Sequence, residues 1–144
     1  DLDEIAAKLN DYTTRVEASF VLDQLKYMAK GGRCSAATAL GANLLNLKPC
    51  IELKNGKMSV GKKYRGSFDK CLASYVKDRL ANRDDIDWDK TFITYTPVSD
   101  SALDLVRNAV AELGHFSTIT ESKAGCTISC HCGPGTLGVL FVRK

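Results

Sequence analysis

The chain has 144 residues, of which 44% are apolar and 26% are charged, and its formal net charge is +3. These proportions are typical of a folded globular domain and exclude a disordered or fibrous chain. A domain of this length buries roughly 68–70% of the surface that its unfolded chain exposes, so we expect one domain with its own core. The small charge does not indicate nucleic-acid binding.

The apolar runs are much shorter than the ~20 residues that cross a bilayer, and no secretory leader opens the chain, so we expect no membrane insertion. The cysteines are too sparse for a disulfide scaffold, and we expect free thiols in a reducing cytoplasm. There are six of them: Cys34, Cys50, Cys71, Cys126, Cys130 and Cys132. Because the first residue is Asp1 rather than methionine, we expect a fragment of a longer protein.

In the first half of the chain, apolar residues at helical spacing predict a helix over residues 2–16, and a short apolar run predicts a strand over 18–22. Asp23 is expected to cap a helix that stops at Gly31 and Gly32. An alanine- and leucine-rich segment predicts a further helix over 36–45. Pro49 opens a predicted hairpin whose Asn55-Gly56 pair is typical of a type I′ turn.

A two-residue turn at that place puts Leu53 opposite Met58 and Ile51 opposite Val60. In the second half of the chain, apolar stripes predict helices over 68–80 and 102–113. Aromatic and β-branched residues predict strands over 91–95, 116–120, 125–132 and 137–142. No repeat or linker divides the chain, so we expect one α+β (α/β) domain in which a mixed β-sheet packs against helices.

The segment Gly133-Pro134-Gly135-Thr136-Leu137-Gly138 matches the G-x-G-x-x-G pattern of dinucleotide-binding loops. Only six residues follow it, too few for the remaining helix and strand of such a unit, and Pro134 removes a backbone donor. We therefore expect a tight turn between two strands, with Gly133 and Gly135 as its scaffold, and no nucleotide site.

On the predicted 125–132 strand, alternation places Cys126, Cys130 and Cys132 on one face. Cys126 and Cys130 would lie roughly 13 Å apart at ~3.3 Å per residue, too far to share a zinc ion, so no metal site is expected. His131 falls on the opposite face, at the strand end. It is either a hydrogen-bonded structural residue or a ligand contact beside unhindered backbone.

Basic residues cluster beside flexible backbone at Arg33 and in the run Lys62, Lys63 and Arg65. They form either a solvated surface or a contact for an anionic ligand or an acidic partner. His115 follows a predicted helix end, where its charge would complement the helix dipole. No hydrolase, zinc-peptidase or Walker signature is present in the sequence, which disfavours an autonomous enzyme and assigns no catalytic residue.

Several motifs in this order resemble the DegV family. They are Gly31-Gly32-Arg33-Cys34-Ser35, Leu44-Leu45-Asn46-Leu47-Lys48-Pro49, Asn55-Gly56, Arg65-Gly66 and His131-Cys132-Gly133-Pro134-Gly135-Thr136-Leu137-Gly138. The resemblance extends over most of the chain and identifies it as the C-terminal domain of a two-domain bacterial protein.

What the resemblance implies is a protein that encloses one long-chain fatty acid and needs no cofactor. His131 would hydrogen-bond the carboxylate, while Arg65, and less directly Arg33, would lie near the carboxylate's mouth or face a partner. In FakB members the partner is a separate fatty-acid kinase, which forms an acyl phosphate. The resemblance also implies a missing N-terminal domain that holds the carboxylate from the other side, with residues 1–18 leading in from it.

Two other functions stay open at this point. The first is a non-enzymatic regulatory or nucleic-acid-interacting module that uses Lys62, Lys63 and Arg65, with the apolar residues forming only the core. The second is a metal-binding or hydrolytic enzyme, which stoichiometric zinc would indicate.

Overall fold

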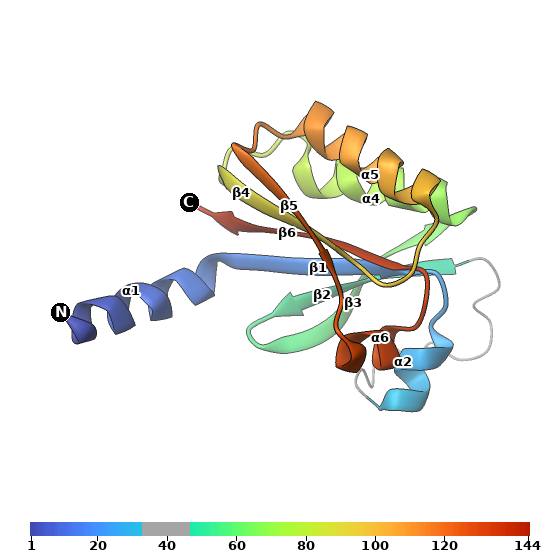
Figure 1. Ribbon diagram of the computed structural model, residues 1–144, viewed down its shortest axis with the longest axis horizontal. Helices are drawn as coiled ribbons and strands as arrows, with labels where there is room; N and C mark the ends of the chain where they lie inside the picture. Colours follow the sequence, from blue (N-terminus) through green and yellow to red (C-terminus); the bar gives the residue numbers. More distant parts are fainter. Residues whose placement is uncertain (33–46) are drawn as a thin grey trace.

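The computed structural model describes residues 1–32 and 47–144. In these residues the helices are α1 (Leu2–Arg15), α2 (Lys26–Gly31), α4 (Phe68–Leu80), α5 (Asp100–Leu113) and α6 (Cys126–Cys132). The strands are β1 (Val16–Leu22), β2 (Leu47–Lys54), β3 (Lys57–Arg65), β4 (Ile86–Tyr95), β5 (Thr118–Lys123) and β6 (Thr136–Arg143). The six strands form one mixed sheet with helices on both faces, which confirms the expected α/β class (Figure 1).

The strand order in the sheet is β3-β2-β1-β6-β4-β5. Only the β4–β5 pair is parallel; the other neighbours are antiparallel. The last strand, β6, therefore lies in the middle of the sheet, with Val16 of β1 opposite Val142 and Leu22 opposite Thr136.

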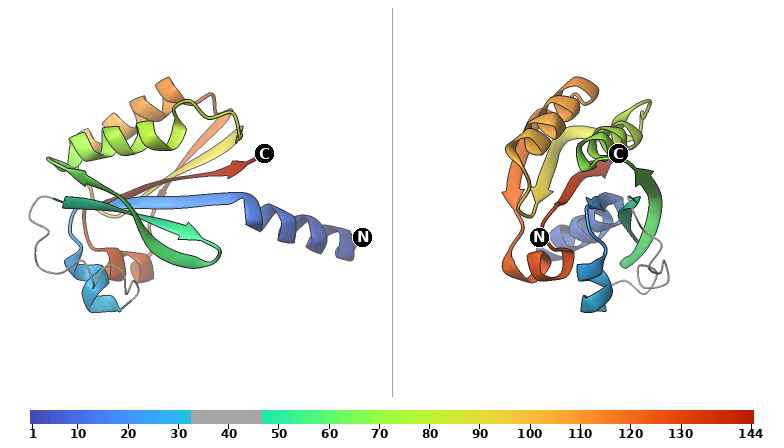
Figure 2. Two further views of the ribbon diagram at one scale, coloured as in Figure 1. Left: turned by 180° about the vertical axis from the view of Figure 1, so that it is seen from behind. Right: turned by 90° about the vertical axis from the view of Figure 1, so that its right-hand side faces the viewer.

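Helices α4 and α5 cover one face of the sheet, and the main core lies beneath them (Figure 2). The α4 residue Tyr75 is fully buried there. Its hydroxyl donates to the Ser19 carbonyl at 2.8 Å and accepts the Val139 N–H at 2.9 Å, so a side chain from α4 bridges β1 and β6. Burial raises the pKa of this phenol.

Helices α2 and α6 lie beside one another on the opposite face, close to one end of the sheet (Figure 1). A second apolar cluster of Leu22, Met28, Ile51 and Cys132 packs there. The rest of this face carries an apolar row, one residue from each of five neighbouring strands, with α1 projecting beyond it. The row consists of Met58, Leu53, Ala18, Leu140 and Phe92.

The structure confirms the predicted hairpin. Asn55 (φ 51°) and Gly56 (φ 72°) both adopt positive φ, as a type I′ turn requires. Leu53 pairs with Met58, and Ile51 with Val60, in the expected register. The stop of α2 is also confirmed, because Gly32 adopts the left-handed conformation at φ 62°. The predicted helix over 36–45 lies outside the described residues.

The predicted strand over 125–132 is wrong, because this segment is the helix α6. Ser129 N–H donates to the Gly125 carbonyl at 3.0 Å, and Gly133 N–H donates to the Ser129 carbonyl at 2.8 Å. The Thr136 hydroxyl donates to the terminal Cys132 carbonyl at 3.3 Å. These local bonds satisfy the backbone without a neighbouring strand, and they override the β-branched composition. The glycine turn consequently joins a helix to a strand, not two strands.

Two smaller expectations are also corrected. Asp23 does not cap α2, whose N-cap is Leu25, because the Asp23 carboxylate is paired with Lys48 instead. The predicted strand over 116–120 lies two residues further along as β5. Phe116 is outside it because its ring packs against Trp88, at a centroid distance of 4.7 Å, and against Phe141.

Candidate functional site

The candidate site is centred on His131, which lies in the last turn of α6 and is half-buried. Its imidazole packs directly on Gly31, the last residue of α2. A Cβ atom at Gly31 would lie 2.5 Å from Nδ1 of His131, inside van der Waals contact. The absence of a side chain at Gly31 therefore sets where the imidazole can lie.

The turn between α6 and β6 is held by close approach of backbone to side chains. Gly133 (φ 74°) and Gly135 (φ 73°) both adopt conformations that L residues rarely reach. A Cβ at Gly133 would overlap the Tyr27 ring, and one at Gly135 would lie 2.6 Å from the Asp23 Cβ. Both glycines thus allow α2 and the end of β1 to press against the turn beside His131.

An ion pair at the base of this turn was not found from the sequence. Lys48 Nζ lies 2.6 Å from the Asp23 carboxylate and also donates to the Asp23 carbonyl at 3.0 Å. The Asp23 N–H in turn donates to the Gly135 carbonyl at 2.7 Å. The Lys48 side chain is only 16% exposed, so the pair links β1, β2 and the glycine turn from a partly buried position. The only sequence signal for it was the basic residue within the Leu44–Pro49 motif.

Arg65, the second predicted contact, is the last residue of β3 and is exposed opposite Leu47. It lies near the same end of the sheet as His131, but among the described residues no hydrogen bond or ion pair joins the two side chains. Lys62 is paired with Asp78 at 2.6 Å and its ammonium lies over the Tyr64 ring. Lys63 is exposed. Arg33 lies outside the described residues.

The helical geometry of α6 changes the environment of its cysteines. Cys132 is buried in the apolar cluster, and burial raises the pKa of its thiol, whereas Cys126 and Cys130 are exposed. The expected separation of Cys126 and Cys130 along a strand is therefore wrong, because they lie one helical turn apart. Within residues 1–32 and 47–144, no group of three or more His, Cys, Asp or Glu residues could hold a metal ion. His115 is exposed, and its ring lies 5.8 Å from that of Trp88.

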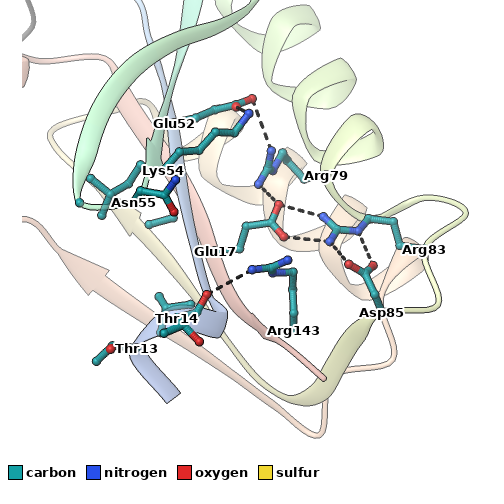
Figure 3. Close-up of a pocket in the computed structure, with 14 residues that line it drawn as sticks. Thr13, Thr14, Glu17, Glu52, Lys54, Asn55, Arg79, Arg83, Asp85 and Arg143 are labelled. Atoms are coloured by element: carbon teal, nitrogen blue, oxygen red, sulfur yellow. Dashed lines mark hydrogen bonds and ion pairs between the residues drawn. The ribbon is translucent and has the colours of Figure 1, made fainter. Parts of the chain in front are cut away.

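A separate cleft of about 830 Å³ opens at the other end of β1 and β6 (Figure 3). Glu17 of β1 lies at its centre. Its carboxylate accepts hydrogen bonds from Arg79, in the last turn of α4, and from Arg83, which follows that helix. Arg83 also binds Asp85 at 2.6 Å, so its guanidinium bridges the Glu17 and Asp85 carboxylates. The hydrogen bond from Arg83 holds the pKa of Asp85 below its usual value. These charges already neutralise one another, so we interpret the four side chains as a structural ion-pair cluster, called the clasp below, that joins the end of α4 to the sheet.

No helix among the described residues is long and apolar enough to cross a membrane. The fold and the site define a mixed α/β domain that presents a histidine at a glycine-rich turn. The family model described as "Uncharacterised protein, DegV family" matches residues 1–144, and the chain belongs to the DegV family.

A DegV domain-containing protein of Clostridium acetobutylicum is 26% identical over 144 residues, which cover 99% of this chain and 49% of that protein. Among solved structures, a fatty-acid-binding DegV family protein from Streptococcus agalactiae is similar with a TM-score of 0.78 and 28% identity. The match covers all of this chain and 50% of that one.

The fatty acid kinase (Fak) B3 protein of Streptococcus pneumoniae, solved with linoleic acid, matches in fold with a TM-score of 0.75 and 15% identity. It too is covered to 50% by the whole of this chain. The chain thus spans about half the length of the relatives that it matches.

Proposed function

We propose that this chain is the C-terminal part of a protein that binds one long-chain fatty acid, and that His131 hydrogen-bonds the carboxylate. Membership of the DegV family and the 28% identity to a fatty-acid-binding member support the ligand class. The observation that carries the proposal is the combination of a half-buried histidine on α6 with the apolar sheet face that α6 only partly covers.

The acyl chain fits the apolar row that crosses this face. The row extends over five strands, or roughly 19 Å at about 4.8 Å per neighbouring pair. Its outer members Met58, Leu53 and Phe92 remain exposed in this chain, at 38%, 46% and 40%. Each methylene group that is buried against such a surface contributes about 0.8 kcal/mol, so a long tail alone supplies considerable affinity.

The carboxylate would lie at the end of this sheet face where α6 carries His131, because an imidazole N–H can donate to it there. Lys48 does not compete for it, because Asp23 already neutralises its charge. Arg65 would lie near the carboxylate, at the mouth of the binding site, or face a protein partner. The same role is proposed for Arg33, which lies outside the described residues. The remaining donors would come from a preceding domain. Of the residues 1–18 expected to lead in from it, only α1 could do so, because Val16 already begins β1 of this sheet.

The protein itself would not be an enzyme. We propose that it presents the carboxylate to a separate fatty-acid kinase for formation of an acyl phosphate. The likeness of fold to the pneumococcal B3 protein supports this step. An acid whose tail is enclosed and whose head group lies near exposed arginine is suited to such a transfer, because a partner can reach only the reactive end.

Denaturing mass spectrometry of the full-length protein tests the proposal directly. One C14–C18 fatty acid should be released per chain, and His131→Gln should weaken binding of added palmitic acid about 10- to 100-fold, since a hydrogen bond to a charged group contributes about 1.5–3 kcal/mol. His115→Gln is the matched control, because His115 is exposed beside Trp88, near the start of β4, whereas the turn lies at the other end of that strand. Absence of any released or added fatty acid would refute the proposal.

The nucleic-acid alternative gains no support from the basic run on β3. Asp78 neutralises Lys62, which leaves two exposed basic residues there, Lys63 and Arg65. A nucleic acid complex that weakens steeply with salt, in the same full-length protein, would be the contrary result.

A further inference from the structure

Helix α6 carries two exposed thiols beside the histidine of the proposed site. Cys126 and Cys130 are both exposed and occupy positions i and i+4 of the helix, so they share one face. His131 directly follows Cys130, and α6 stands next to α2 on the side of the sheet away from α4 and α5 (Figure 1).

The other described cysteines, by contrast, are buried. Cys50 and Cys71 belong to the main core, and burial raises the pKa of both thiols, that of Cys50 to about 12. Cys132 is buried beneath α6, and its pKa is raised for the same reason. Burial keeps these three from reagents in the solvent, so among the described cysteines Cys126 and Cys130 are the accessible ones.

We infer that Cys126 and Cys130 form a dithiol site that small-molecule disulfides oxidise to an intramolecular disulfide, and that this oxidation displaces His131 from Gly31. One cysteine thiolate attacks a sulfur of the external disulfide, which forms a mixed disulfide and releases one thiolate. The second cysteine thiolate attacks the protein sulfur of that mixed disulfide and releases the second. Two protein thiols are oxidised, one external disulfide is reduced to two thiols, and the two protons pass to the released thiolates.

The geometry of α6 couples this chemistry to the histidine. Cβ atoms at i and i+4 of a helix lie about 5–6 Å apart, whereas a disulfide needs about 3.5–4.5 Å, so the helix must distort to close the bond. The helix has seven residues and is bounded by Gly125, around which a Cβ would meet nothing within 4 Å, and by Gly133. It can therefore yield at its Gly125 end, whereas the Tyr27 ring and the Thr136 hydroxyl hold its Gly133 end. His131 directly follows Cys130, and its imidazole occupies the space where a Cβ of Gly31 would lie, so a displacement of Cys130 moves the imidazole from this place.

A disulfide formed under such strain is easily reduced, because strained and exposed disulfides have higher reduction potentials than structural ones. The site would thus respond to the ratio of disulfide to thiol in its surroundings. The dithiol itself is independent of the ligand, but its effect on fatty-acid binding rests on the proposed role of His131.

The test exposes the full-length protein to oxidised glutathione and maps its cysteines by mass spectrometry without reduction. The expected product is a Cys126–Cys130 disulfide, with palmitic acid bound about tenfold or more weakly than by the reduced protein. The Cys126→Ser and Cys130→Ser variants should each take a single glutathione adduct, and in the reduced state both should bind palmitic acid as the parent protein does.

Free thiols, two adducts, or pairing of Cys126 or Cys130 with another cysteine would overturn the dithiol site. A Cys126–Cys130 disulfide that leaves the affinity unchanged would overturn the coupling. If the reduced protein does not bind palmitic acid, the proposed function fails by itself. The coupling is then decided by the NMR signal of the His131 ring, assigned with His131→Gln, which must shift on oxidation.

Discussion

At the scale of single residues, Gly31 determines the position of His131. It ends α2, its φ is not in the left-handed region, and the imidazole occupies the space that a Cβ would need. Gly31→Ala should leave the free energy of unfolding within about 1 kcal/mol, because the higher helix propensity of alanine offsets part of the clash. The same substitution should lower the affinity for fatty acid, as His131→Gln does, because the imidazole must move away from the new Cβ. Calorimetric titration of the full-length variant with palmitic acid measures the affinity.

Gly125→Ala is the matched control for Gly31→Ala. Gly125 precedes α6 with φ −64°, and a Cβ there would meet nothing within 4 Å. The substitution should therefore leave both the stability and the affinity nearly unchanged. Equal losses of affinity for the two alanine variants would show that the contact between Gly31 and His131 does not matter.

At the scale of elements, Glu17 joins the end of α4 to β1. Its carboxylate accepts from Arg79 and Arg83, whose side chains are 14% and 21% exposed. Glu17→Gln should lower the free energy of unfolding by about 1–3 kcal/mol, because it leaves two partly buried guanidinium groups short of negative charge. Urea unfolding of the full-length protein measures the change. Glu4→Gln, which breaks only the exposed pair between Glu4 and Lys8, should cost less than about 0.5 kcal/mol, and a similar loss in both variants would contradict the clasp.

The same clasp gives a pH dependence with a defined sign. The pKa of Asp85 is lowered in the fold by the hydrogen bond from Arg83, so the ionised carboxylate stabilises the native state. This contribution is fully present above the pKa of the unfolded chain and is lost as the pH falls through the lower folded value. Asp85→Asn should therefore reduce the acid-induced fall in stability. An unchanged pH profile for this variant would exclude Asp85 as a contributor.

At the scale of the whole molecule, helix α1 exposes an apolar stripe. None of its residues is buried, and its apolar stripe of Leu2, Ile5, Leu9 and Tyr12 is exposed. If, as proposed above, a further domain precedes this one, the stripe should pack on it in the full-length protein. Ile5→Asp together with Leu9→Asp should then lower the melting temperature. Ala7→Asp with Asn10→Asp, which adds the same charges at exposed positions on the opposite face of the helix, should lower it much less. Equal melting curves for the two double variants would mean that the stripe stays exposed.

Local signals accounted for much of this architecture, and contacts distant in the sequence accounted for the rest. The Asn55-Gly56 turn fixed the hairpin register because two residues with positive φ suffice for it. The prediction failed for residues 126–132 because their composition favours a strand. The Thr136 hydroxyl, which lies beyond the segment, donates to the last carbonyl of the helix that they form. His131 was singled out as a candidate from its glycine-rich neighbours, but its contact with Gly31 spans 100 positions and leaves no periodic trace. The pairing of Asp23 with Lys48 was invisible for the same reason.

The central place of β6 determines when this domain can fold during synthesis. The hairpin of β2 and β3 with β1 is translated early, and β4 with β5 follows, but within the described sheet the two parts join through β6, which emerges near the end of the described chain. Until then the nascent polypeptide has two incomplete sheets, each with an open edge that invites pairing with other chains. A premature stop codon before residue 136 would therefore leave an aggregation-prone product rather than a slightly shortened protein.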